Sequence, residues 1–372
     1  MTRAAWLVIA LAIELAFAAT RPVAAQNYIR EQLRIQMPAA GPTGLEALLI
    51  RPAGNGPYPL ALISHGAPRD ASARATMTVN RLYRQAVEFA RRGFAALVVM
   101  RRGFGSSGGA YAENSGPCAR RDYLRTGRES TNDLRAAVAA MQKRTDVTTD
   151  RFIAVGISAG GFASIALSAD PPPGLAAVIN FAGGRGSRDE DDVCDEDALV
   201  RAFAAFGTTS RVPTLWIYAE NDKFFWPELA HRMHAAFIRG GGRAQFIDAD
   251  EFGEDGHSLF ADGIAIWTPT VDAFLRAQNL GGRDLLPPPT LAALPPPPRL
   301  GDKGRAGFAN YLTAGPHKAF AVSPRGAWAS RSGQRSPEEA QEKAIEACSK
   351  YAADCSVYAV NDGLSAKADA AR

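Results

Sequence analysis

One stretch of eleven residues constrains the fold of this chain more than any other, Arg151 to Gly161, which reads RFIAVGISAGG. Its first part, Phe152 to Val155, is apolar and contains β-branched residues, which is typical of a buried strand. Gly156 and Gly160 predict a sharp turn around Ser158, and the apolar residues after the turn recur at helical spacing. The stretch therefore predicts a strand, a sharp turn and a helix in direct succession.

This context gives Ser158 chemical significance. A serine at such a turn is held in a strained conformation with its Oγ exposed, and side chains at Gly156 and Gly160 would collide with the neighbouring backbone. The helix that follows directs its unpaired N–H groups and the positive end of its dipole at the same place, where an oxyanion would form. We therefore predict that Ser158 is a nucleophile. The alternative is a serine in an ordinary glycine-rich turn.

Strands and helices alternate over most of the chain. Two strands come first, at residues 30–37 and 45–51, and the first of them alternates polar and apolar residues as an edge strand does. Besides the strand before Ser158, further strands are predicted at residues 59–64, 94–100, 175–181, 212–218 and 244–248, and helices near residues 78–91, 130–143, 227–238 and 261–276. An antiparallel start followed by repeated βαβ units predicts an α/β fold with a mostly parallel sheet between two layers of helices.

The N-terminal residues predict export. Arg3 precedes an apolar run from Trp6 to Ala19, interrupted by Glu14, and small residues lead to a cleavage position after Ala25. An uncleaved anchor is the alternative, but the run is shorter than the roughly 20 residues that a spanning helix needs. We expect residues 1–25 to be a signal peptide and the mature protein to be periplasmic or secreted, without stable membrane insertion.

The charge and the cysteine content of the chain each narrow its function. The formal net charge of +4 is small for 372 residues, and without a basic face it gives no case for a nucleic-acid partner. An even number of cysteines, 4, favours disulfides in an oxidising environment. Cys348 and Cys355 are close in sequence, which leaves Cys118 and Cys194 as the other pair.

A proline-rich segment, residues 281–301, predicts a linker between two domains. We expect a large domain over residues 26–280, a small α+β module over residues 302–362 and a disordered tail over residues 363–372. In the module, residues 318–322 and 327–331 are predicted to pair as strands. Ser336 to Glu339 has the form of a capping box that opens a helix to about Tyr351, and a last strand follows at residues 355–360.

A nucleophilic serine needs a base, and the base needs a carboxylate that orients it. Asp222 follows the strand at residues 212–218, and His257 follows the strand at residues 244–248. Ligands bind at the carboxyl ends of parallel strands, so both residues are predicted to lie near Ser158. The alternatives are a helix-capping aspartate and a surface histidine, and Glu220 is the substitute acid.

Two backbone N–H groups are candidates for the oxyanion hole. Ala159 directly follows Ser158, and Ala67 lies in the loop after the strand at residues 59–64, where Pro68 has no N–H to offer. His65 is predicted to have a structural role in that loop. Phe224, Phe225 and Trp226 are candidates to line an acyl pocket, the alternative being ordinary packing beneath the next helix.

Together these motifs resemble the α/β-hydrolase superfamily, nearest to its dienelactone-hydrolase-like and serine esterase branches. The resemblance covers about residues 30–280 and rests on His65-Gly66, Arg102-Gly-Phe-Gly-Ser-Ser-Gly, Gly156-Ile-Ser-Ala-Gly, Asp222 and Gly256-His257. It implies acyl transfer to water through an acyl-serine, with no metal or organic cofactor. Dienelactone hydrolases use a cysteine as the nucleophile at the position where this chain has Ser158. The resemblance therefore does not assign their substrate to this chain. The C-terminal module resembles a small module of exported bacterial proteins.

Two insertions, residues 109–125 and 183–206, are predicted to roof the pocket. Each carries one cysteine, so a Cys118–Cys194 disulfide would join them over the site. Arg120 and Arg121 flank Cys118, and acidic residues flank Cys194, so opposite charges are expected to favour the pairing. The alternative is two free thiols on solvated loops.

These observations predict an exported serine hydrolase that cleaves small or medium carboxylic esters through Ser158, His257 and Asp222. A peptidase or amidase on the same residues is the first alternative, with a peptide as substrate. The second is a catalytically silent hydrolase fold that serves as a binding protein and contacts the cell envelope through its C-terminal module.

Overall fold

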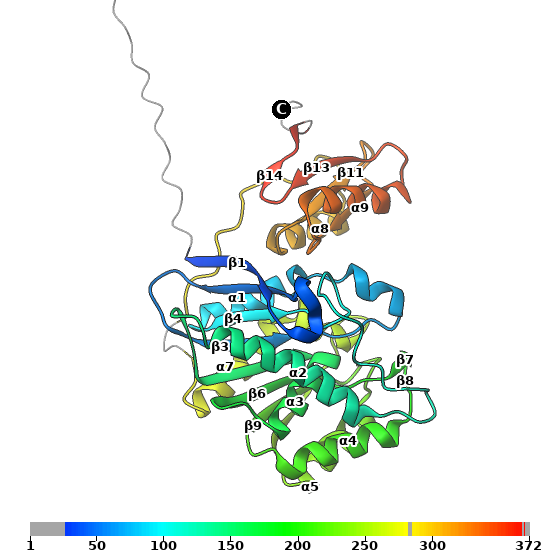
Figure 1. Cartoon of the computed structure of the whole chain (residues 1–372). Coiled ribbons are helices and arrows are strands. Elements are labelled where there is room, and N and C mark those ends of the chain that lie inside the picture. Colours follow the sequence, from blue (N-terminus) through cyan, green and yellow to red (C-terminus); the bar gives the residue numbers. More distant parts are fainter. Residues whose placement is uncertain (1–26, 282–284, 367, 369–372) are drawn as a thin grey trace, which may run out of the picture.

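The computed structural model describes residues 27–281, 285–366 and 368, so the predicted signal peptide lies outside the described residues. No helix in these ranges is long and apolar enough to cross a membrane. The chain forms one large sheet flanked by helices and, near the C-terminus, a separate small sheet with its own helices (Figure 1). The predicted α/β architecture and the additional α+β module are therefore confirmed.

The large sheet has eight strands in the order β1-β2-β4-β3-β5-β6-β9-β10. Their bounds are β1 Tyr28–Ile35, β2 Leu45–Pro52, β4 Ala95–Val99, β3 Tyr58–Ser64, β5 Val147–Ile157, β6 Leu175–Phe181, β9 Pro213–Ala219 and β10 Arg243–Ala249. Strand β2 runs antiparallel to β1 and β4, and the strands from β4 to β10 are parallel. The carboxyl ends of the parallel strands therefore share one edge of the sheet.

Helices cover both faces of this sheet. On one face lie α2 (Tyr123–Met141), α3 (Ala159–Ala169), α4 (Glu196–Thr209) and α5 (Pro227–Arg239), and on the other lie α1 (Tyr83–Arg91) and α7 (Ile264–Ala277). The connections add α6 (Leu259–Asp262) and four short 3₁₀ helices, η1 (Pro38–Thr43), η2 (Ala71–Thr76), η3 (Val79–Leu82) and η4 (Gly256–Ser258). Side chains alternate between the two cores, as in β4, where Leu97 belongs to one core and Val98 to the other.

The turn between β5 and α3 is as tight as its sequence predicts. Ser158 has a φ of 55° and a ψ of −123°, in a region that residues with a side chain rarely adopt. A Cβ on Gly156 would lie 2.1 Å from the carbonyl oxygen of Gly160, and a Cβ on Gly160 would lie 2.1 Å from the carbonyl oxygen of Ser64. The two glycines are therefore required because backbone occupies the space of a side chain.

Helix α2 begins at Tyr123, several residues before the predicted start near residue 130. Asp122 caps its first turn, and Gly127, which reads as a helix breaker, lies inside the helix. A Cβ on Gly127 would lie 2.8 Å from Cζ of Phe206 in α4, so the glycine allows two helices to approach closely. This long-range contact is invisible in the local sequence.

The C-terminal module has four strands in the order β12-β11-β13-β14 and two helices. Its elements are α8 (Asp302–Thr313), β11 (Ala319–Val322), β12 (Trp328–Arg331), α9 (Pro337–Ser349), β13 (Ser356–Val360) and β14 (Gly363–Leu364). The sequence analysis does not predict helix α8, because Gly304 and Gly307 disfavour a helix. In the structure both glycines allow α8 to pack closely on Trp328. The prediction of a disordered tail from residue 363 is wrong for Gly363 and Leu364, which pair with β13, and residues 367 and 369–372 of that tail lie outside the described residues.

The module lies beside β1 and the start of α1 (Figure 1). Asn80 in η3 donates its side-chain amide to the carbonyl of Gln334 over 3.0 Å, and Thr78 bonds the carbonyl of Gly333. Both side chains are buried. The module is thus attached to the main domain by buried polar contacts.

We predict that Gly160→Ala prevents the turn at Ser158 from closing. Its Cβ would meet rigid backbone, so the free energy of unfolding should fall by about 3 kcal/mol or more, the upper range for overpacking. Gly363→Ala is the matched control, because its nearest neighbouring atom lies 3.9 Å away. Urea unfolding of both variants measures the difference, and an unchanged midpoint for Gly160→Ala would contradict the prediction.

Candidate active site

A cavity of about 440 Å³ opens at the carboxyl edge of the sheet, beside Ser158. Its wall is formed by three loops, together with Phe224 and Phe225. The loops are the segment after β3, the insertion before α2 and the segment after β6. Ala67, Ser158 and Ala159 lie in the wall together. The residues predicted to attack a carbonyl and to hold its oxyanion therefore share one cavity.

The backbone around Ser158 is fixed by neighbouring strands and loops. Its N–H donates to the carbonyl of Phe181 at the end of β6, over 2.9 Å, and its carbonyl accepts from Phe162 in α3 and from Gly184. The residue is 6% exposed. Ser158 is thus held in a fixed orientation, at the point where the first turn of α3 directs its free N–H groups.

Asp222 and His257 are in direct contact. Nδ1 of His257 lies 3.0 Å from Oδ2 and 3.1 Å from Oδ1 of Asp222, and because a carboxylate only accepts hydrogen bonds, Nδ1 carries the proton. Oδ1 of Asp222 also accepts the backbone N–H groups of Phe224 and Phe225, over 2.8 and 2.9 Å. The Asp222 side chain is fully buried, whereas Glu220 is exposed and does not contact His257.

His257 lies in η4, in the loop after β10. Asp255 stabilises this loop, since its Oδ1 accepts the N–H of His257 over 2.9 Å and that of Lys223 over 3.1 Å. The ring of Phe224 stacks on the imidazole with centroids 3.9 Å apart. No hydrogen bond joins His257 to Ser158 among the residues described, and such bonds often form only when substrate is bound.

The loop after β3 approaches Ser158 closely, since a Cβ on Gly66 would lie 3.2 Å from Cβ of Ser158. Nε2 of His65 accepts the N–H of Arg101 over 3.0 Å, so Nδ1 carries the proton and donates it to the Gly66 carbonyl over 2.6 Å. Burial, aided by the charge of Arg101, lowers the pKa of His65 well below its ordinary value, so the ring stays neutral. In the described part of the chain the N–H of Ala67 has no acceptor, so this donor remains available to a ligand.

A buried charge network that the sequence reading missed supports this loop. Arg101 is fully buried, pairs with Glu113 and donates to the Ser64 hydroxyl over 2.6 Å and to the His65 carbonyl over 2.8 Å. Glu113 also accepts from Arg185 over 2.8 Å. Burial raises the pKa of Glu113, but the two guanidinium groups outweigh it and hold that pKa well below its usual range. The network joins the loop after β3, the insertion before α2 and the segment after β6.

The three aromatic residues after Asp222 have different surroundings. Phe224 and Phe225 line the cavity. Trp226 is not among the lining residues and packs against the hydrophobic core at the start of α5. Of the two possibilities for these residues, Phe224 and Phe225 follow the first, and Trp226 follows the alternative of ordinary packing, because the chain enters α5 directly after it.

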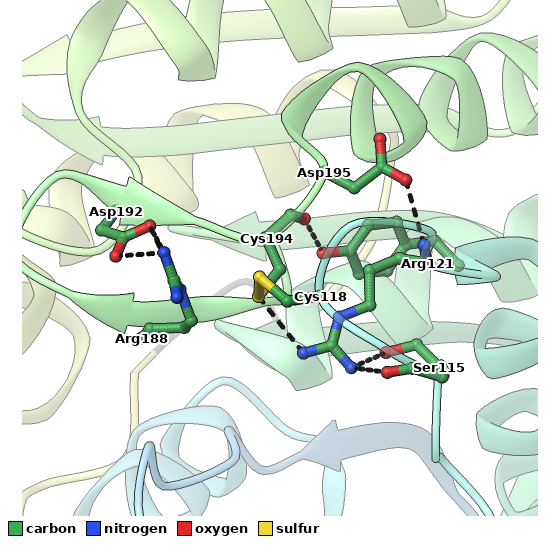
Figure 2. The surroundings of a disulfide bond; sticks show 9 residues. Ser115, Cys118, Arg121, Arg188, Asp192, Cys194 and Asp195 are labelled. Atoms are coloured by element: carbon green, nitrogen blue, oxygen red, sulfur yellow. Dashed lines mark hydrogen bonds and ion pairs between the residues drawn. A yellow bond between two sulfur atoms is a disulfide. The ribbon is translucent and has the colours of Figure 1, made fainter.

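A Cys118–Cys194 disulfide joins the two insertions (Figure 2), and a second disulfide joins Cys348 and Cys355. After Gly186 the second insertion forms a hairpin of β7 (Ser187–Asp189) and β8 (Asp192–Val193) and then α4. Opposite charges meet between the insertions at one place, where Oδ2 of Asp195 accepts the backbone N–H of Arg121 over 3.0 Å, and no side-chain ion pair joins the two insertions among the described residues. Other acidic side chains of the second insertion pair within their own segment or with nearby helices and loops, in the pairs Asp192–Arg188, Glu190–Lys223, Glu196–Arg232 and Asp197–Arg232.

Comparisons with known proteins agree with this architecture. The family model of the X-Pro dipeptidyl-peptidase (S15 family) matches residues 41–230, a range that contains Ser158 and Asp222 and ends before His257. No curated protein matches the chain in sequence.

Solved structures resemble the chain in fold. An acylaminoacyl peptidase of Pyrococcus horikoshii has a TM-score of 0.51 and 14% identity, over 70% of this chain and 44% of the peptidase. An esterase of Pyrococcus furiosus has a TM-score of 0.47 and 14% identity, over 67% of this chain and 90% of the esterase. This chain thus spans less than half of the peptidase. The fold is that of the α/β-hydrolase superfamily, as the sequence motifs predict.

We predict that Glu113→Gln destabilises the protein by about 3 to 5 kcal/mol, because it leaves two buried guanidinium groups without their carboxylate. The pKa of Glu113 is lowered by folding, so its contribution is fully present above the ordinary value of 4.5 and is lost as the pH falls below it. The difference from wild type in urea unfolding should therefore be largest near pH 7 and shrink below pH 4.5.

The exposed Glu346→Gln in α9 serves as the control for this substitution. It removes the same charge from a surface where no partner is lost, so its midpoint should stay near that of wild type. Equal midpoints for wild type and Glu113→Gln at pH 7 would contradict a structural role of the buried network.

Proposed function

We propose that this chain, which belongs to the X-Pro dipeptidyl-peptidase (S15) family of the α/β-hydrolase superfamily, is a serine hydrolase that cleaves carboxylic esters. Ser158 is the proposed nucleophile, His257 the base and Asp222 the residue that orients His257. The observation that carries the proposal is the buried Asp222–His257 pair at the edge of the sheet where the strained turn holds Ser158.

In this mechanism the Oγ of Ser158 attacks the ester carbonyl while Nε2 of His257 accepts its proton. Nδ1 stays bonded to Asp222, whose negative charge stabilises the imidazolium. The N–H groups of Ala67 and Ala159 bind the oxyanion. His257 then gives the proton to the departing alcohol, which leaves an acyl group on Ser158. A water molecule, deprotonated by His257, attacks this acyl group and releases the acid.

A peptidase on the same residues is the second candidate, and the family match favours it. The chemistry at Ser158 would be the same, with an amine instead of an alcohol as leaving group. A third reading is a silent hydrolase fold that binds the cell envelope through residues 302–362. Export of the mature chain through the predicted signal peptide fits all three, and the two disulfides are consistent with it.

We predict that Ser158→Ala lowers kcat for short-chain p-nitrophenyl esters by about a million-fold, the loss expected when the nucleophile of such a triad is removed. Ser349→Ala, an exposed serine in α9, is the matched control and should keep full turnover. Steady-state kinetics on both purified proteins provide the test. A folded wild type without turnover on esters or peptides would favour the silent fold, and a kcat in Ser158→Ala close to that of wild type would point to another nucleophile.

We further predict that Asp222→Asn lowers kcat by about ten-thousand-fold, because an amide favours the wrong tautomer of His257. Glu220→Gln is the control, since it removes an acid two residues away that does not contact the histidine. The ratio of the two kcat values separates the acids. A larger loss in Glu220→Gln than in Asp222→Asn would contradict the assignment.

A further inference from the structure

The cavity beside Ser158 is lined by many cationic side chains. Five arginines and a single carboxylate are among its lining residues, namely Arg69, Arg74, Arg121, Arg185 and Arg188, with Glu113 as the acid. Clefts lined by one sign of charge concentrate ligands of the opposite sign. The charge that remains after internal pairing therefore determines which ligands this cavity favours.

Only part of this charge is compensated. Arg188 pairs with Asp192 over 2.7 Å, outside the cavity lining. The carboxylate of Glu113 is shared between Arg185 and the buried Arg101, so these three groups retain a net positive charge. Within the described ranges, no carboxylate pairs with Arg69, Arg74 or Arg121. The side chains that line the cavity thus carry more positive than negative charge.

These three unpaired arginines differ in what they can offer a ligand. Arg69 uses its N–H groups on the Ser187 hydroxyl and on the carbonyls of Asp189 and Lys223, and it lies 3.6 Å from the ring centroid of Phe224. It therefore acts as a fixed positive charge next to the aromatic ring that covers His257, rather than as a free donor.

Arg74 is the most available donor. Its guanidinium lies 3.9 Å from the ring centroid of Tyr111, and among the described residues it donates no hydrogen bond. Stacking on an aromatic ring fixes the guanidinium plane while its N–H groups remain free. Such a group is suited to bind a carboxylate with two parallel hydrogen bonds.

Arg121 lies in the insertion before α2, beside the Cys118–Cys194 disulfide (Figure 2). It donates to the Ser115 hydroxyl over 3.2 Å and contacts Sγ of Cys194 at 3.3 Å, while its Nε is buried with no partner among the described residues. Asp195 lies close by and accepts the backbone N–H of Arg121 over 3.0 Å (Figure 2), but among the described residues no carboxylate forms an ion pair with the guanidinium of Arg121. The guanidinium is therefore held in place at the cavity wall by neutral partners.

We propose that this cavity binds esters that carry a negatively charged carboxylate, and that Arg74 and Arg121 select it. The inference rests on the proposed function and adds a substrate class to it. The same positive wall disfavours a protonated amine, so α-amino esters and peptides with a free amino end are expected to be poor substrates. The carboxylate stays unchanged in the reaction, and only the ester bond is cleaved at Ser158.

The test compares two esters of similar length, the p-nitrophenyl monoester of adipic acid and its methyl-capped, neutral counterpart. Wild type should have a kcat/KM at least about tenfold higher for the anionic ester, the size expected for a charged hydrogen bond, and added salt should reduce this preference. Arg74→Gln and Arg121→Gln should each reduce the preference about tenfold, mainly through KM, and Arg74→Lys should restore part of it.

Arg120→Gln is the matched control, because this exposed arginine neighbours Arg121 but does not line the cavity. It should keep the preference of wild type. Equal kcat/KM for the two esters in wild type, or an equal loss of preference in Arg120→Gln, would overturn the inference and leave the proposed function intact.

A binding measurement separates failure of the inference from failure of the proposed function. If neither ester is cleaved, the proposed function fails, and monomethyl adipate is titrated calorimetrically into wild type and Arg74→Gln. Binding that is weakened about tenfold by the substitution would support the carboxylate site. An absence of binding to wild type would overturn it.

Discussion

The fold of the main domain depends on the close approach of three backbone segments at Ser158. Strand β5 turns into α3 so sharply that the carbonyl oxygens of Gly160 and Ser64 occupy the space where side chains of Gly156 and Gly160 would be. Ser158 is therefore held at a positive φ, with the end of β3 on one side and the end of β6 on the other. Strained backbone of this kind persists only when its surroundings fix it.

The loops around this turn are fixed mainly by charge. Burying Arg101, Glu113 and Arg185 is costly, and the geometry offsets this cost only because each group has a partner. In return, one carboxylate joins three loops that the sheet alone would not hold together. The disulfide between Cys118 and Cys194 adds a covalent link between two of them. The cavity wall is thereby fixed on a rigid frame, although its residues lie in loops.

Strands and helices could be predicted from sequence where the pattern of apolar residues lies within the element itself. Strand β6 was predicted at its observed bounds, and α5 to within a residue, because Pro227 marks the helix start. The Asp222–His257 contact follows the predicted order of the strands and is present in the structure. The start of α2 and the whole of α8 could not be predicted, because Gly127 and Gly307 disfavour a helix in the local sequence. Both glycines allow close packing against distant residues, which only the folded chain shows. The Arg101–Glu113–Arg185 network was missed for a similar reason, since its members become neighbours only when their loops meet.

The central claim is that the turn at residues 156–160 carries the nucleophile. Peptide mapping of the folded, mature protein after reaction with a fluorophosphonate tests it most directly. We predict a single adduct, on the peptide that contains Ser158. A folded protein that forms no adduct, or an adduct on another serine with Ser158 unmodified, would contradict it.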